Sequence, residues 1–201
     1  MADYWNHNTA YHPWLVSIAE QHRGDVLDVG CGDGLLAQRL APLSRSVTCI
    51  DPAPATAGRA RDRLGGLRSV SVHDTSFHEY DAGSTRFDLI IFVAAIHHMD
   101  LRASLLKARD LLRPSGEIAI VGLAANKTAW DWIWSALCLP AVRIGSMLHH
   151  ETRDIGVPVM DAGDNLSEIR QVADDVIPGA DVRRALYYRY LLRWKRTVGS
   201  A

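Results

Sequence analysis

The sequence predicts a single α/β domain in which a doubly wound, mostly parallel sheet is covered by helices on both faces. Short apolar runs alternate with helical patterns five times along the first two thirds of the chain, and this alternation is typical of parallel sheets with helical crossovers. The run Phe87–Val93 is almost entirely apolar, as expected for a strand that is buried on both faces. A length of 201 residues suits one sizeable domain.

The predicted strands and helices follow one another in a regular order. Residues 26–29 predict the first strand, and a helix over Leu35–Leu40 comes after it. Residues 47–50 predict the second strand, and two glycines close the helix around residues 55–64 that follows. The remaining predicted elements of this part are a short third strand, the fourth strand, a helix with one apolar face and a fifth strand, at residues 70–72, 87–93, 101–112 and 118–121. Residues 113–116 fit a type I turn before the fifth strand, with proline at the second position and glycine at the fourth.

The last third of the chain has a less regular pattern. Residues 126–150 predict one or two helices broken near Pro140. Residues 151–165 show no period and predict a loop, whereas residues 166–176 predict a helix. Residues 182–195 have a length that suits two strands or one long bent strand. The helix before Pro140 would place four apolar residues on one face: Trp130, Ile133, Trp134 and Leu137. This face could be plain core, a cap over an apolar substrate or a dimer contact.

Composition and charge argue against several classes of function. A net charge of −1 at pH 7 gives no overall electrostatic basis for binding nucleic acid or an anionic membrane. The longest apolar run, residues 89–96, is far shorter than the ~20 residues that span a bilayer. Cys31, Cys49 and Cys138 are too few and too scattered for a disulfide framework or a metal site. The polar and aromatic first residues do not resemble a secretion signal, so we expect a cytoplasmic protein with reduced thiols and no metal.

The most informative stretch is an apolar run that ends in glycines at alternate positions. Gly30, Gly32 and Gly34 follow Asp28, and glycine permits a tight turn and a close approach of a ligand to the backbone. Their G-x-G-x-G spacing differs from the G-x-G-x-x-G of a dinucleotide site, and no lysine follows as in a phosphate-binding P-loop. The carboxylate of Asp28 would repel a diphosphate and attract an ammonium. The pattern therefore favours S-adenosylmethionine (SAM), which carries an ammonium and no phosphate.

From Asp28 to Gly34 the chain resembles the first motif of the class I SAM-dependent methyltransferases, and further matches follow in that family's order over residues 14–122. The resemblance implies that Asp51 binds the ribose hydroxyls and that Asp74 contacts the adenine amino group. It also implies a seven-stranded sheet with an antiparallel C-terminal strand, and a turn before the fifth strand in which Ser115 stands where the family usually has glycine. The expected cofactor-binding residues are Asp28, Gly30, Cys31, Gly32, Gly34, Asp51, Pro52, Asp74, Thr75, Val93 and Ala94.

Several of these residues also have a purely structural interpretation. The glycines could simply make a tight turn between strand and helix. Asp51 could cap the helix that begins near Pro52, and Asp74 could be a turn residue. Cys31 is expected to pack as a small residue inside the loop rather than to act as a nucleophile.

His97 and His98 follow the fourth strand and are the candidate catalytic residues. A histidine with an ordinary pKa near 6.5 can take a proton from a hydroxyl or an amine during transfer, although both residues could instead be structural or line a pocket. Neighbouring histidines converge poorly on a metal ion, even together with His149 and His150. Methyl transfer does not require a base, because orientation alone supplies up to ~7–11 kcal/mol, whereas a positioned base adds about 3–5 kcal/mol.

The resemblance also divides the single domain, residues 1–201, into four parts. Residues 1–22 are expected to form an N-terminal helical lid with aromatic side chains, the alternative being an ordinary helix packed on the sheet. The other parts are a cofactor-binding core, a helical cap or insertion, and the last helix with the C-terminal strands, at residues 23–122, 123–165 and 166–201. Arginine and aromatic residues alternate over residues 183–196; they could bind RNA, but they more simply form the two faces of a hairpin at the sheet edge.

The expected function is transfer of a methyl group from SAM to an oxygen or nitrogen of a small organic molecule, with S-adenosylhomocysteine (SAH) as the product. The alternatives are an RNA or protein acceptor, a SAM-binding protein without transferase activity, and an NAD-dependent oxidoreductase. We expect a monomer or homodimer without a membrane partner, and nucleic acid is not favoured as a partner. Residues 1–14 and 123–165, which would build the acceptor pocket, carry the least pattern, so the sequence does not predict the acceptor.

Overall fold

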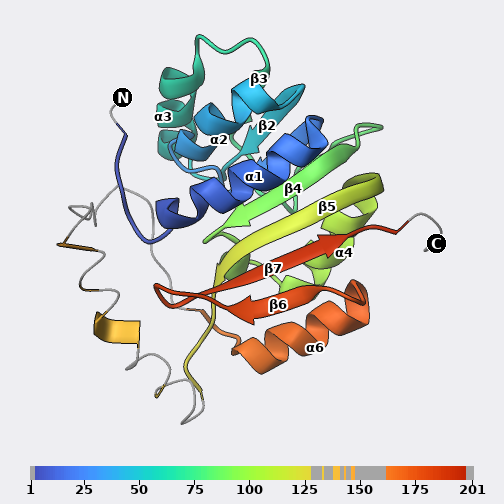
Figure 1. The fold of residues 1–201 in the computed structure, drawn as a ribbon. Coiled ribbons are helices and arrows are strands. Elements are labelled where there is room, and N and C mark those ends of the chain that lie inside the picture. The colour runs from blue at the N-terminus through green and yellow to red at the C-terminus, as the bar shows by residue number, and fades with distance from the viewer. Residues whose placement is uncertain are drawn as a thin grey trace.

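One mixed sheet of seven strands organises the chain (Figure 1). The computed structural model describes residues 3–127, 133, 138–140, 143, 146–147 and 162–197. The strand order is β3-β2-β1-β4-β5-β7-β6, and β7 runs antiparallel to both of its neighbours. The strands are β1 (Asp25–Val29), β2 (Ser46–Ile50), β3 (Val70–His73), β4 (Phe87–Val93), β5 (Leu112–Leu123), β6 (Asp181–Arg184) and β7 (Arg189–Lys195). The predicted fold class is confirmed, and residues 182–195 contribute two strands rather than one.

Side-chain caps mark the start of two helices. The side chain of Asp100 accepts a hydrogen bond from the amide of Ala103, 2.7 Å away, at the start of α4. Asn165 and Glu168 form a reciprocal capping box at the start of α6. The helices are α1 (His12–His22), α2 (Leu35–Leu40), α3 (Pro54–Leu64), α4 (Leu101–Leu111) and α6 (Leu166–Val176), with short 3-10 turns η1 (Thr9–Tyr11), η2 (Ala41–Leu43) and η3 (Ile96–His98).

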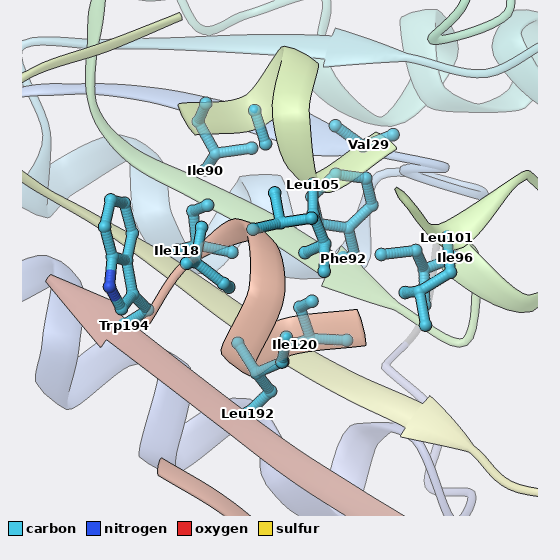
Figure 2. Close-up of a cluster of buried hydrophobic side chains, with 14 of the residues drawn as sticks. Val29, Ile90, Phe92, Ile96, Leu101, Leu105, Ile118, Ile120, Leu192 and Trp194 are labelled. Carbon is cyan, nitrogen blue, oxygen red and sulfur yellow. The ribbon is translucent and has the colours of Figure 1, made fainter. Parts of the chain in front are cut away.

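The alternation of side chains along the strands divides the core into two layers. Leu89 and Ile91 of β4 pack with residues of α1, α2 and α3 on one face of the sheet. Ile90 and Phe92 point to the other face, where they meet α4 and α6. Figure 2 shows this second layer, in which Leu105 of α4 lies among residues of β4, β5 and β7. The nearly continuous apolar run of β4 is therefore explained, because both of its faces are buried.

The predicted type I turn at residues 113–116 is wrong. These residues lie within β5, where the pairing with β4 skips from Leu112 to Glu117. Ser115 has a φ of +66°, whereas the third residue of a type I turn has a φ near −90°. Its amide donates to the carbonyl oxygen of Arg196 at 3.2 Å, so the end of the neighbouring strand holds this irregular stretch. A left-handed conformation favours glycine, so the serine at this position is strained.

A cluster of ion pairs closes the amino-terminal edge of the sheet. The guanidinium of Arg113 donates to Asp88 at 2.6 Å and to Asp25 at 2.7 Å. Arg45 also donates to Asp25, at 2.8 Å, and the Asp25 amide donates to the carboxylate of Asp88 at 2.7 Å. The bond from Arg45 is the largest cause that holds the pKa of Asp25 well below its usual range. The carboxylates at this edge are therefore balanced by neighbouring arginines.

Much of the predicted segment 126–150 lies outside the described residues. Residues 133, 138–140, 143 and 146–147 are helical, whereas Trp130, Trp134 and Leu137 and most of the predicted loop at 151–165 are not described. Within the described part of the chain, no helix is both long and apolar enough to cross a bilayer.

Candidate cofactor site

The predicted site residues gather where the winding of the sheet changes direction. From β1 the chain proceeds outward to β2 and β3, and it then returns to place β4 on the other side of β1. In open α/β sheets, ligands bind outside the carboxyl ends of the strands at such a switch point. A Cβ atom built at Gly30, after β1, would lie 2.5 Å from the Cβ of Ala95, after β4. The loops that follow β1 and β4 are therefore in close contact at this edge.

Glycine is needed at the three loop positions for different structural reasons. All adopt a left-handed backbone, with φ of +70° at Gly30, +58° at Gly32 and +82° at Gly34. A Cβ at Gly34 would lie 2.7 Å from the side chain of Leu64 of α3, and Gly30 is equally crowded, whereas a Cβ at Gly32 would meet nothing within 4 Å. Packing against protein thus explains Gly30 and Gly34. Gly32 faces open space, as a close approach of a ligand to the backbone requires.

Asp28 is a buried carboxylate with an unused oxygen. The residue is 1% exposed, and its Oδ2 atom accepts no hydrogen bond from any residue that the structure describes. Burial, followed by repulsion from Asp51, raises the pKa of Asp28 to about 7. An unpaired buried carboxylate is costly unless a cation or a donor reaches it, so this position suits the ammonium of an amino acid.

Asp51 lies at the end of β2 and holds the glycine loop. Its Oδ2 accepts from the amide of Gly32 at 3.1 Å and its Oδ1 from the amide of Ala53 at 3.0 Å. Burial raises the pKa of Asp51, although these two amides act to lower it. Ala53 rather than Asp51 is the N-cap residue of α3, so simple helix capping does not explain this aspartate. Each carboxylate oxygen can accept more than one bond, and the predicted contact with ribose hydroxyls is chemically compatible with this geometry.

Asp74 and Thr75 follow β3 in a more exposed position. The carboxylate of Asp74 accepts a bond of 2.8 Å from Arg61 of α3, and its side chain is about half exposed. The bond to its own backbone amide, and then the neighbouring Arg61, hold the pKa of Asp74 below its ordinary value. Among the residues that the structure describes, no hydrogen bond joins Asp74 or Thr75 to the glycine loop. Their role in adenine binding remains a prediction.

The residues after β4 border the same edge. Val93 and Ala94 are partly exposed; Ala94 has a φ of +48°, and its amide donates to Val121 of β5 at 2.7 Å. His97 is half-buried and His98 is exposed, and their ring centroids lie 4.1 Å apart. His97 and His98 follow Ala95, the residue that approaches Gly30, and their catalytic role stays a prediction.

For two further residues of the loop, Cys31 and Asp33, only the first had an expected role. The hydrogen bond with Cys49, and then burial, raise the pKa of Cys31, which keeps the thiol protonated and agrees with a packing role. Asp33 carried no assigned role, yet it is 8% exposed and accepts bonds from Tyr4 at 3.0 Å and Arg63 at 2.8 Å. Sequence reasoning missed this cluster because its members are about 30 positions apart. The local signal was only an acidic residue between two glycines.

The chemistry of the edge fits SAM better than a dinucleotide. Two buried carboxylates, Asp28 and Asp51, border the loop, and they would repel a diphosphate in a medium of low dielectric constant. The same carboxylates can receive an ammonium and a pair of hydroxyls. The open side of Gly32 leaves room for the ligand against the backbone.

Comparisons with known proteins indicate a methyltransferase. Residues 27–118 match the family model described as a methyltransferase domain. An uncharacterized methyltransferase of Mycobacterium tuberculosis is 31% identical over 198 residues, which span 96% of this chain and 98% of that protein. A ubiquinone biosynthesis O-methyltransferase of Cereibacter sphaeroides is 33% identical over 104 residues, 50% of this chain and 42% of that enzyme.

A solved structure shares the fold. The N-methyltransferase NodS of Bradyrhizobium japonicum, crystallised with SAH, superposes with a TM-score of 0.62 at 16% identity, over 95% of this chain and 88% of that one.

Proposed function

Since the chain belongs to the class I SAM-dependent methyltransferases, we propose that it transfers the methyl group of SAM to an oxygen or nitrogen atom of a small organic molecule. The observation that carries the proposal is the buried oxygen of Asp28, which has no hydrogen-bond partner among the described residues and lies on the strand that leads into the loop where Gly32 faces open space. Relatives named as a ubiquinone biosynthesis O-methyltransferase and as an N-methyltransferase support an oxygen or nitrogen acceptor.

The residues of this chain would mainly bind and orient the reactants. SAM supplies a methyl group on a positively charged sulfur, which leaves as the neutral thioether of SAH. In its ionised form Asp28 would balance the ammonium of the donor, and Asp51 would accept bonds from the ribose while it fixes the Gly32 amide. Holding the reacting atoms in line can supply most of the rate enhancement. His97 or His98 would take the acceptor's proton where the acceptor is not already ionised.

Calorimetry with SAH tests the donor half of the proposal. The wild-type protein should bind SAH, and Asp51→Ala should weaken binding by about 1.5–3 kcal/mol, the range for hydrogen bonds to charged groups. Asp175→Ala is the matched control, because it removes an exposed carboxylate of α6 that pairs with Arg102. Equal affinity of wild type and Asp51→Ala would remove Asp51 from the site.

A panel of acceptors tests the other half. SAH should form with small phenols, amines or carboxylic acids, and the rate should depend weakly on salt. A steep fall in acceptor binding with rising salt would favour RNA instead, and binding of SAH without turnover on any acceptor would favour a SAM-binding protein. With an acceptor in hand, His97→Gln and His98→Gln should be compared, because a loss confined to kcat identifies the base.

A further inference from the structure

We propose that residues 3–11 form a strap that couples the cofactor loop to the hairpin between β6 and β7, with Tyr4 and Asp33 as positioning residues. The inference rests on the proposed function and adds a connection between the cofactor loop and a hairpin at the same edge of the sheet. Figure 1 shows this segment running along the carboxyl edge of the sheet, from the side of α2 and α3 to the start of α1 beside the β6–β7 turn.

The first anchor of the strap lies on the glycine loop itself. The hydroxyl of Tyr4 donates to Oδ1 of Asp33 at 3.0 Å. Arg63 of α3 donates to the other carboxylate oxygen at 2.8 Å and to the carbonyl oxygen of Asp33 at 3.1 Å. Burial, and then the neighbouring Asp33, raise the pKa of the Tyr4 phenol, so the phenol stays a donor. Asp33 lies between Gly32 and Gly34, and the strap therefore contacts the segment that would hold the cofactor.

A second set of contacts joins α2 to the first residue of the strap and to the start of α1. Arg39 donates to the carboxylate of Asp3 at 3.0 Å, and it lies 3.2 Å from Nδ1 of His12. Burial, and then the charge of Arg39, lower the pKa of His12 to about 4. At neutral pH His12 is therefore uncharged, and its Nδ1 can accept the bond from Arg39.

The other anchor lies on the β6–β7 hairpin. The side-chain oxygen of Asn8 accepts two bonds from Arg189, at 2.7 and 2.9 Å, and the hydroxyl of Tyr11 donates to the carbonyl of Leu186 at 2.6 Å. The ring of His7 stacks on that of Tyr187, with centroids 4.7 Å apart. These contacts reach the hairpin through both side chains and backbone.

The hairpin stands on the same edge of the sheet as the glycine loop. Arg189, the first residue of β7, pairs with Leu123, the last residue of β5, so the turn lies at the carboxyl end of the parallel strands. Tyr187 and Tyr188 have φ values of +57° and +58°, a conformation that non-glycine residues seldom adopt and that surrounding contacts must hold. The packing of His7 and Trp5 against Tyr187 is one such contact.

One continuous segment therefore contributes to the order of both loops. A ligand that immobilises the glycine loop also fixes Asp33 and, through Tyr4, the strap. Ordering one end lowers the entropic cost of ordering the other, so donor binding should make the hairpin more rigid. A strap that only stabilises the fold would show no such dependence on the ligand.

Hydrogen exchange with and without SAH tests the coupling. In the wild type, SAH should slow exchange at residues 30–34 and also at residues 185–190. In Tyr4→Phe the slowing at 30–34 should persist while that at the hairpin is lost, and SAH should dissociate about tenfold faster, at the low end for a bond to a charged group. Asn8→Ala cuts the other anchor and should also abolish the effect at the hairpin. Ser46→Ala is the control, because it removes a hydroxyl bond of 2.7 Å to Asp25 at the opposite edge.

The outcomes separate this inference from the function on which it rests. Absence of any slowing at residues 30–34 in the wild type would overturn the proposed function and the inference with it. Slowing at 30–34 with an unaffected wild-type hairpin would overturn the coupling alone. Hairpin protection that survives in both Tyr4→Phe and Asn8→Ala would also overturn the coupling alone, and so would protection that is lost equally in Ser46→Ala. If Tyr4→Phe does not fold, Asn8→Ala decides the question.

Discussion

The buried carboxyl of Asp28 should make the stability of the ligand-free protein depend on pH. Burial and the nearby Asp51 raise the pKa of Asp28 from 3.8 to about 7. Between these values the unfolded chain has lost the proton and the folded chain still holds it. The contribution of Asp28 to stability is therefore fully present below pH 3.8 and is lost as the pH rises towards 7 and above.

The magnitude follows from the size of this difference. A rise from 3.8 to about 7 is roughly 3 pKa units, and each unit corresponds to about 1.36 kcal/mol, which gives about 4 kcal/mol as an upper value. Asp28→Asn removes the titration. The free energy of unfolding of the variant minus that of the wild type should therefore increase by up to about 4 kcal/mol between pH 4 and pH 8.

Urea denaturation of both proteins at several pH values measures this difference, because the contributions of groups that do not interact with Asp28 cancel. Calorimetry gives an independent check. At pH 6.5, SAH should release a proton from wild-type Asp28, so the binding heat should vary with the ionisation enthalpy of the buffer, whereas Asp28→Asn should show no such variation. A difference in unfolding free energy that is constant from pH 4 to 8, together with buffer-independent binding heats in the wild type, would refute the reasoning.

Three further changes test other parts of the structure. Ser115→Gly should raise the unfolding free energy by about 0.5–1 kcal/mol. This is the cost of a left-handed backbone at an L-residue minus the cost of the greater conformational freedom of glycine in the unfolded chain. A lower midpoint in urea would mean that the φ of +66° at Ser115 is not strained. Gly32→Ala should cost about 1–2 kcal/mol of stability. It should also weaken SAH binding at least tenfold in calorimetry, because its Cβ meets no protein atom within 4 Å and would occupy the space proposed for the ligand. Unchanged affinity would place the ligand elsewhere. Glu117, 1% exposed, accepts bonds from Arg193 and His22. Glu117→Gln should cost about 2 kcal/mol at pH 7. Burial acts to raise the pKa of Glu117, but these bonds hold the pKa below its ordinary value. The difference in unfolding free energy between the variant and the wild type should therefore shrink as the pH falls below 4. A difference that stays constant there would contradict this account.

The sheet could be predicted because its signals are local. The apolar run of β4 and the alternation of strands and helices are visible in short windows, and β1 to β4 lie within a residue of the predicted strands. The prediction for residues 182–195 did not divide β6 from β7, and β5 is longer than predicted. The irregular stretch around Ser115 was misread because proline and glycine spacing reports only local preference. The pairing of its amide with Arg196, 81 positions later, decides the conformation.

The candidate site could be predicted only in part, because only some of its signals are local. Asp28 and Gly32 belong to one short pattern, whereas Asp51 lies 17 positions after Gly34 and was expected from the family resemblance. The structure links Asp51 to the loop through its bond with the Gly32 amide. The link from Tyr4 to Asp33 joins residues that are 29 positions apart. No periodicity or spacing marks such a pair, because its geometry exists only after α1 and α2 have packed.

The ion cluster at the amino edge has a consequence for protein engineering. Arg113 and Arg45 tie the bases of β1, β2, β4 and β5 together through Asp25 and Asp88, on the side of the sheet away from the loops that would choose an acceptor. Grafting acceptor loops from other members of the family onto the opposite side leaves this clamp intact, so chimaeras that keep the four residues should melt close to the parent. A large drop in melting temperature for such grafts would show that the clamp does not carry the scaffold.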